Sequence, residues 1–124
     1  MGAIRIFIRS MKYAWDGVIG AATERSFQIH IVAAIVVCAF GFLFNISRVD
    51  WSIILICIGM VMGMEAMNSA VERLVDFVCP QLDPRAGKIK DLSAGAVLIV
   101  SAIAAVVGII IFWPYILTLL SYTS

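Results

Sequence analysis

Charged side chains are scarce in this sequence, and they almost cancel one another. Only 14% of the 124 residues are charged, 63% are hydrophobic, and nine basic and eight acidic residues leave a formal net charge of +1. This composition excludes a water-soluble globular domain. It also provides no bulk electrostatic attraction to nucleic acid, so we expect no nucleic-acid partner.

Several motifs of metal, nucleophile and nucleotide chemistry are missing. The three cysteines form an odd number without metal-ligand spacing, which favours neither a zinc site nor a disulfide framework. The one histidine, His30, has no Ser or Cys partner in a recognisable motif, so a catalytic triad is not supported and we interpret it as a helix-start residue. The residues around Gly87-Lys88 do not form a phosphate-binding P-loop.

Long apolar segments are what the sequence does contain. We expect membrane spans at about residues 27–47, 51–78 and 90–114, because each is long enough to cross ~30 Å of hydrocarbon. Pro114 is expected to mark a break near the far membrane surface.

The N-terminal residues, about 3–22, have the period of an amphipathic helix. Apolar residues recur on one face and basic residues on another; the apolar set is Ile4, Ile8, Met11 and Trp15. Ahead of three spans, such a helix is typical of one that lies on the membrane surface. The sequence therefore predicts an all-α integral membrane protein with three transmembrane helices and an N-terminal surface helix, in a single domain of residues 1–124.

The distribution of Lys and Arg predicts how the chain is oriented. Four basic residues precede the first span, four more lie at the loop between the second and third spans, and only Arg48 lies between the first and second. Because cytoplasmic loops carry the excess of Lys and Arg, we expect the N-terminus and the second loop to be cytoplasmic and the C-terminus to lie outside.

Four polar residues form a stripe along the second span. Their separations of three, four and four place them on one face of a helix; they are Glu65, Asn68, Glu72 and Asp76. A carboxylate at the hydrocarbon centre costs about 2.5 kcal/mol or more, so such groups face protein, water, metal or ligand. The stripe is a candidate site.

Further ionisable residues precede the first and third spans at the same depth. They are Glu24, Arg25, Lys90 and Asp91. Carboxylates from different helices together with a lysine are typical of Mg²⁺ binding through acidic ligands and substrate phosphates. This set favours phosphoryl transfer at the cytoplasmic face, where a soluble substrate can meet a lipid.

Two other classes of function stay open on the residues alone. A small proton-coupled transporter could use Glu65 as a relay, but the outer halves of the spans carry almost nothing ionisable. A non-enzymatic assembly subunit could pack through small residues of the second span. Helix association alone does not explain why Glu24, Lys90 and Asp91 reach the depth of the stripe.

The stripe also lies within a recognisable signature. Residues 65–72, Glu-Ala-Met-Asn-Ser-Ala-Val-Glu, followed by Val75 and Asp76, resemble the E-x-x-N-[ST]-A-x-E-x-x-V-D signature of the prokaryotic diacylglycerol kinases. The resemblance continues through residues 86–91 and 94–98 and, upstream, at residues 13–17 and 23–25. It implies a lipid kinase of the bacterial inner membrane, a homotrimer of three-span protomers with active sites built between neighbours.

The resemblance implies a role for each matching position. Glu65 is similar to the general base that takes the proton from the lipid hydroxyl, with Asn68 one turn away. Glu24 and Glu72 match the carboxylates that bind Mg²⁺, and ATP is the implied phosphoryl donor. The implied nucleotide contacts are Lys90, Asp91, Asp76 and Tyr13, and the implied lipid contacts are Glu65, Trp15 and Ala94.

The lipid acceptor is read from two further segments. Residues 23–30, Thr-Glu-Arg-Ser-Phe-Gln-Ile-His, and residues 108–114, Gly-Ile-Ile-Ile-Phe-Trp-Pro, are more similar to the undecaprenol kinase branch than to the diacylglycerol branch. Undecaprenol is therefore the favoured acceptor, with diacylglycerol next. Residues 81–83, Gln-Leu-Asp, depart from the Glu-Tyr-His of enterobacterial relatives, so no nucleotide contact is assigned there.

Overall fold

A computed structural model describes residues 2–123, which form four helices and no strand. The helices are α1 (Gly2–Ala22), α2 (Arg25–Leu43), α3 (Arg48–Val78) and α4 (Pro84–Thr123). The all-α prediction is confirmed, and α2, α3 and α4 are each long and apolar enough to cross a membrane.

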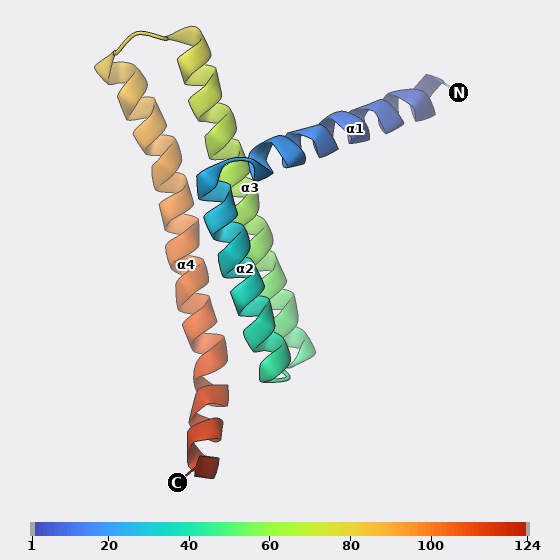
Figure 1. Ribbon diagram of the computed structural model, residues 1–124, viewed down its shortest axis with the longest axis vertical. Coiled ribbons are helices and arrows are strands. Elements are labelled where there is room, and N and C mark those ends of the chain that lie inside the picture. The colour runs from blue at the N-terminus through green and yellow to red at the C-terminus, as the bar shows by residue number, and fades with distance from the viewer. Residues whose placement is uncertain (1, 124) are drawn as a thin grey trace.

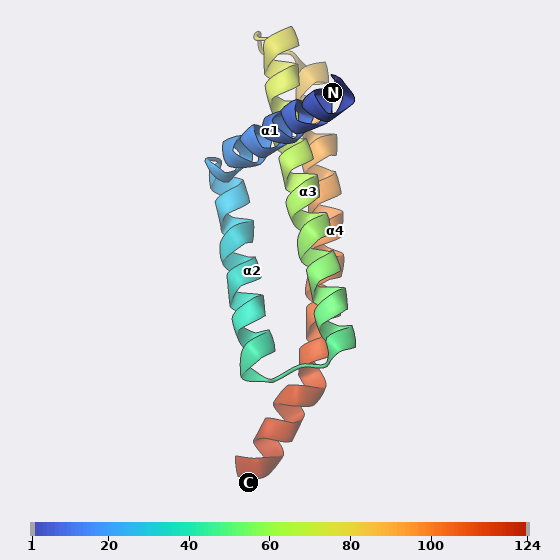
Figure 2. The ribbon, with the colours of Figure 1, turned by 90° about the vertical axis from the view of Figure 1, so that its right-hand side faces the viewer.

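The bundle is built on the antiparallel hairpin of α3 and α4, which run side by side over most of their length (Figure 1). α2 packs against α3, and α1 leaves the bundle at a steep angle from the start of α2 (Figure 2). The turn between α3 and α4 extends beyond the junction of α1 and α2 in both views. The α3–α4 hairpin therefore projects past the level at which α1 leaves.

The apolar side chains of α1 have little to pack against within the chain. Ile6 is 69% exposed and Phe7 65%, although α1 is amphipathic in sequence. Apolar and basic faces on a helix outside the bundle are what a helix lying in the membrane interface requires.

The turn between α2 and α3 is fixed by backbone hydrogen bonds that end α2. Asn45 has a φ of 48°, and the Ile46 amide donates to the Gly41 carbonyl oxygen at 3.2 Å. This is a Schellman motif, in which a left-handed residue closes a helix. A Cβ on Gly41 would lie 2.7 Å from an indole carbon of Trp51, so only glycine lets that ring approach α2 this closely.

Polar groups at the same end connect α3 to α4. The Ser47 hydroxyl accepts from the Asp50 amide at 3.1 Å and so caps α3. The Tyr115 hydroxyl donates to the Asp50 carboxylate at 2.7 Å and accepts from the Ser47 amide at 3.2 Å. The buried apolar cluster beside them consists of Ile46, Ile54 and Ile111. This packing sets the register of the helices that deliver the polar residues at the other end.

Pro114 does not end α4, which continues through it to Thr123. The expected break is instead a bend: the C-terminal part of α4 turns away from the axis of the rest (Figure 2). Proline removes one amide donor and crowds the carbonyl one turn earlier, which kinks a helix where the flanking residues still favour it.

Candidate active site

The antiparallel register of α2 against α3 brings together residues that are far apart in the sequence. Glu24, just before α2, meets Ser69 and Arg73 of α3, whereas His30, six residues later, meets Glu65, which lies earlier on α3. As the residue number increases along α2, the residue number of its contact on α3 decreases. One polar cluster results, and α3 supplies most of it.

Glu65 is the most deeply buried polar residue of this cluster, with 3% of its surface exposed. Its Oε2 lies 3.8 Å from Nε2 of His30, within ion-pair range but too long for a hydrogen bond. A buried carboxylate is costly unless a charge or hydrogen bond compensates it. Burying the Glu65 carboxylate therefore costs free energy, and a polar ligand or a cationic partner would offset that cost.

Asn68 lies one turn along α3 and is 8% exposed. Its Nδ2 donates to Oε1 of Glu72 at 3.4 Å, while its Oδ1 is buried and has no hydrogen-bond partner within residues 2–123. A buried acceptor without a partner is rare, and it indicates a missing ligand, ion or water. This unpartnered oxygen belongs to a side chain that is hydrogen-bonded to the Glu72 carboxylate.

Glu24 is held by two donors from α3. The Ser69 hydroxyl donates to its Oε2 at 2.7 Å, and the Arg73 guanidinium donates to its Oε1 at 2.5 Å. The Ser69 hydrogen bond, and then Arg73, hold the pKa of Glu24 below its usual range. Glu24 is therefore a carboxylate at neutral pH, fixed at the point where α1, α2 and α3 meet.

The remaining predicted site residues are distributed unevenly. Lys90 Nζ lies 2.9 Å from Asp76 Oδ1, which joins α3 to α4 beyond the start of α2. Asp91 and Ala94 are exposed on the following turns of α4. Tyr13 and Trp15 are 65% and 64% exposed on α1, and no hydrogen bond or ion pair of the described chain joins them to the cluster. Within one chain, the end of α1 adjoins Glu24, but Tyr13 and Trp15 are not joined to the cluster.

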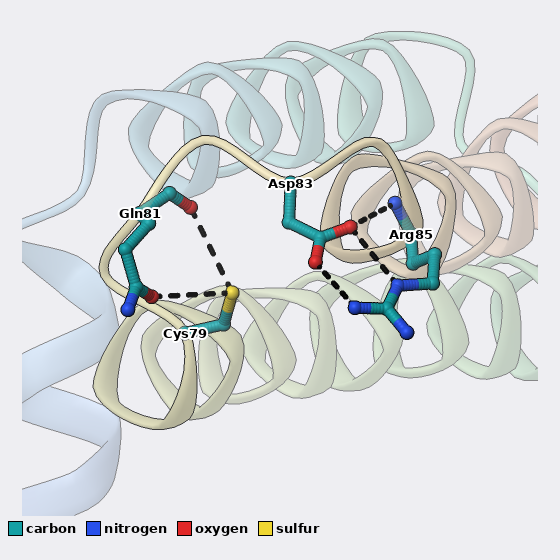
Figure 3. A network of polar contacts seen from close by, with 4 residues as sticks. All are labelled: Cys79, Gln81, Asp83 and Arg85. Atoms are coloured by element: carbon teal, nitrogen blue, oxygen red, sulfur yellow. Dashed lines mark hydrogen bonds and ion pairs between the residues drawn. The ribbon is translucent and has the colours of Figure 1, made fainter.

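The loop between α3 and α4 is closed by its own polar contacts (Figure 3). The Cys79 thiol donates to the backbone oxygen and the side-chain oxygen of Gln81 at 3.7 and 3.6 Å. The Asp83 carboxylate accepts from the Arg85 amide at 2.8 Å and from the Arg85 guanidinium, and these bonds lower the pKa of Asp83. Asp83 thus caps α4 ahead of Pro84, the order that favours a helix start.

An apolar groove of about 910 Å³ opens between α2 and α4, with α3 as its floor. Almost all of its lining is apolar, and the polar exceptions are His30, Cys57 and Ser101. Because His30 also lies beside Glu65, the groove ends at the polar cluster. An apolar chain lying in this groove would have its polar end near Glu65.

Sequence reasoning missed three members of the cluster: His30, Ser69 and Arg73. For His30 a signal was available, because an ionisable residue inside an apolar span is a functional candidate by default. Ser69 and Arg73 flank the stripe on the same helix, but their pairing with Glu24 depends on how α2 packs on α3. The spacing of residues along one helix does not predict how α2 is aligned with α3.

The donor set suits a hard cation in company with phosphate oxygens. Residues 2–123 contain no group of three or more His, Cys, Asp or Glu side chains that could hold a metal by themselves. Mg²⁺ commonly needs only one or two carboxylates, with waters and substrate phosphates completing its coordination. Glu72, beside the unpartnered Asn68 oxygen, and the ionised Glu24 fit that requirement.

Three membrane-spanning helices and a polar cluster around the buried carboxylate of Glu65, at the end of an apolar groove, define a membrane protein equipped for chemistry on a lipid. The chain belongs to the prokaryotic diacylglycerol kinase family, whose family model matches residues 12–112. It is a bacterial membrane protein and a lipid kinase. Of the three classes that the residues left open, the kinase is the correct one.

The relatives match most of the length of this chain. The chain is 38% identical to the undecaprenol kinase of Bacillus subtilis over 109 residues, 87% of this chain and 89% of the relative. It is 34% identical to a diacylglycerol kinase of Synechocystis sp. over 113 residues, 90% of this chain and 65% of the relative. With the diacylglycerol kinase of Escherichia coli the identity is 26% over 87% of this chain and 89% of the relative. The similarity to the undecaprenol kinase branch is confirmed.

Proposed function

We propose that this protein transfers the γ-phosphoryl group of ATP, with Mg²⁺, directly to the hydroxyl of a membrane lipid alcohol, and that undecaprenol is the preferred acceptor, with diacylglycerol next. The observation that carries the proposal is the buried carboxylate of Glu65 at the end of an apolar groove. The higher identity to an undecaprenol kinase supports the choice of acceptor.

Glu65 is the general base of the proposed reaction. The alcohol oxygen attacks the γ-phosphorus as Glu65 takes the hydroxyl proton, and ADP leaves on the opposite side. Such a transfer needs positioning, charge neutralisation and a base, but no covalent protein intermediate. Burial of Glu65 excludes competing water, and Asn68 is placed one turn away to orient the reacting groups.

The other carboxylates and Lys90 serve the nucleotide. Mg²⁺, held by Glu24, Glu72 and the phosphates, would neutralise the charge of the transferring group. Lys90, kept in place by Asp76, contacts a phosphate, and Asp91 lies on the adjacent position of α4. Tyr13 contributes a nucleotide contact, and Trp15 and Ala94 contact the lipid.

The active assembly is a homotrimer in the inner membrane. The N-terminus, the cluster and the α3–α4 loop face the cytoplasm, where ATP is available, and the C-terminus lies outside. The basic residues of α1 and of the first turns of α4 support this orientation, because both segments adjoin spans and carry the Lys and Arg excess of the cytoplasmic side.

The test is phosphate transfer from γ-labelled ATP by purified protein in mixed micelles that offer undecaprenol or diacylglycerol separately. We expect labelled lipid with Mg²⁺, more with undecaprenol, and about a 100-fold or larger loss of turnover in Glu65→Gln with ATP affinity retained, the size typical of a lost base. Glu72→Gln is expected to weaken Mg-ATP binding instead.

Asp16→Asn is the matched control, because it makes the same carboxylate-to-amide change on the exposed part of α1. It should leave turnover within about twofold, as surface substitutions usually do. Near wild-type turnover in Glu65→Gln would remove Glu65 from the role of base. No label in either lipid, from folded wild-type protein, would overturn the proposed reaction itself.

A further inference from the structure

Within residues 2–123, His30 is the basic side chain that lies within ion-pair distance of Glu65. The imidazole comes from α2 and the carboxylate from α3, and their closest atoms are 3.8 Å apart. The side chain of His30 is 24% exposed and that of Glu65 is 4% exposed. The pair therefore joins a buried carboxyl group to a more exposed imidazole.

The surroundings of His30 contain few other groups that could serve in its place. On the groove lining, Cys57 of α3 is the other titratable side chain, and it lies about two turns from Glu65. α4 contributes only the neutral hydroxyl of Ser101 among apolar residues. Glu24 is turned to Ser69 and Arg73, and the charged residues of α1 end at Asp16.

Burial makes the charge of Glu65 expensive, and a base must be charged to act. An imidazolium at ion-pair distance offsets much of that cost, whereas an unpaired buried carboxylate takes up a proton instead. A buried base must also release the proton that it receives in every turnover. Histidine is suited to both tasks because it changes charge near neutral pH.

We propose that His30 is a positioning residue that acts through Glu65: it keeps the buried carboxylate ionised and oriented, and it discharges the proton that Glu65 takes from the lipid hydroxyl. This inference rests on the proposed function, in which Glu65 is the base. No sequence motif assigns this role to His30.

The proton balance over one turnover is simple. The resting pair is an imidazolium and a carboxylate. The alcohol O–H bond breaks as its oxygen bonds to phosphorus, and the proton forms an O–H bond on Glu65. The imidazolium, no longer facing a negative charge, then loses one proton to water. The proton on Glu65 passes to the neutral imidazole, which restores the starting pair.

The experiment compares His30→Gln and His30→Ala with wild type in the phosphate-transfer assay between pH 6 and pH 9. Glutamine retains hydrogen bonding but has no positive charge, so we expect kcat to fall about 10- to 100-fold at pH 7. The deficit should shrink toward pH 9, because a higher pH favours loss of the proton that His30 would otherwise discharge. KM for ATP should stay within twofold, because His30 is not among the proposed nucleotide contacts.

Imidazole added to His30→Ala tests the same role chemically. The cavity left by the truncation should admit imidazole and raise kcat several-fold, with no such effect on wild type or on His30→Gln. Cys38→Ala is the matched control, since it truncates another residue of α2 that does not line the groove. It should keep the wild-type pH profile and show no response to imidazole.

The outcomes separate the two levels of the proposal. A deficit that is equal at all pH values, a change confined to KM, or kcat within twofold of wild type would overturn the role of His30. If His30→Ala does not assemble, the pH profile of His30→Gln decides alone. An inactive wild type or an active Glu65→Gln would instead overturn the proposed reaction or its base.

Discussion

At the scale of single residues, the site depends on hydrogen bonds that only the tertiary structure creates. Ser69 is 5% exposed and donates to Glu24, so its hydroxyl connects α3 to the start of α2. A second buried hydroxyl, that of Ser101 on α4, has no partner in residues 2–123. The Ser69 hydroxyl is therefore expected to stabilise the fold, whereas the Ser101 hydroxyl is expected to destabilise it.

We expect Ser69→Ala to destabilise the protein by about 1–2 kcal/mol, because it removes a hydrogen bond to a charged acceptor. Ser101→Ala should be neutral or slightly stabilising, since it removes a buried polar group that gains nothing. The measurement is the free energy of unfolding of both variants in detergent micelles. Equal losses for the two serines would show that the Ser69–Glu24 bond contributes nothing specific.

The sequence identified the acidic members of the cluster but not all of their partners. The helical spacing of Glu65, Asn68 and Glu72 was enough to place them on one face, because residues three and four apart on a helix share a side. The contact of His30 with Glu65 could not be obtained in this way. His30 and Glu65 are 35 positions apart in the chain, and their contact depends on how α2 packs against α3.

At the scale of elements, helix existence was predictable and helix ends were less so. Long uncharged stretches fixed the three spans, since little else accommodates them. The end of α2 at Leu43 follows from the Asn45 and Gly41 geometry, and the helix at Pro114 continues because flanking residues outweigh one missing amide. Both outcomes depend on local backbone geometry that hydropathy does not encode and, at Gly41, on the packing of Trp51 against α2.

The start of α4 gives a prediction at this scale. Asp83 should cap α4 as a carboxylate, so Asp83→Ala should speed amide exchange in the first turn about fivefold, the size expected for a lost N-cap. Asp83→Asn keeps a capping oxygen and should keep most of the protection. Exchange as fast in Asp83→Asn as in Asp83→Ala would show that the cap depends on charge alone.

The stability that the Asp83 cap gives to α4 should depend on pH, because Arg85 shifts the pKa of Asp83. Because Arg85 lowers the pKa of Asp83, the capping contribution is complete above the ordinary value near 3.8 and is lost as the pH falls through the lowered pKa. The chemical shift of the Arg85 amide should report that titration, with a midpoint that rises in Arg85→Ala. An unchanged midpoint would show that the Arg85 side chain does not lower the pKa of Asp83.

At the scale of the whole molecule, one chain leaves much of its surface without a partner. Its exposed area is 9514 Å², whereas a compact soluble protein of 13.5 kDa exposes about 6,500 Å². None of the side chains described in the chain is fully buried. Lipid can cover much of this apolar surface, but it cannot complete a polar site.

The position of α1 allows a test of the proposed homotrimer. Trp15 lies seven residues before the end of α1, about 10 Å along a helix that leads away from its own bundle. If Trp15 contacts the lipid that Glu65 deprotonates, the proposed homotrimer can supply the two residues from different chains. In a closed homotrimer every chain then gives its α1 to a neighbour and receives one in return.

Mixing inactive chains tests this arrangement. Trp15→Ala and Glu65→Gln protomers, dissociated and reassembled in equal amounts, should recover about a quarter of wild-type turnover, because a complete site needs an intact α1 from one chain and an intact Glu65 from its neighbour. Each variant reassembled alone should stay at its own low turnover, and cross-linking should give trimers in all samples. If both residues served a site within one chain, every mixed site would carry one defect, and mixing would yield only the average of the two variants. Recovery above that average therefore requires a site built between neighbouring chains.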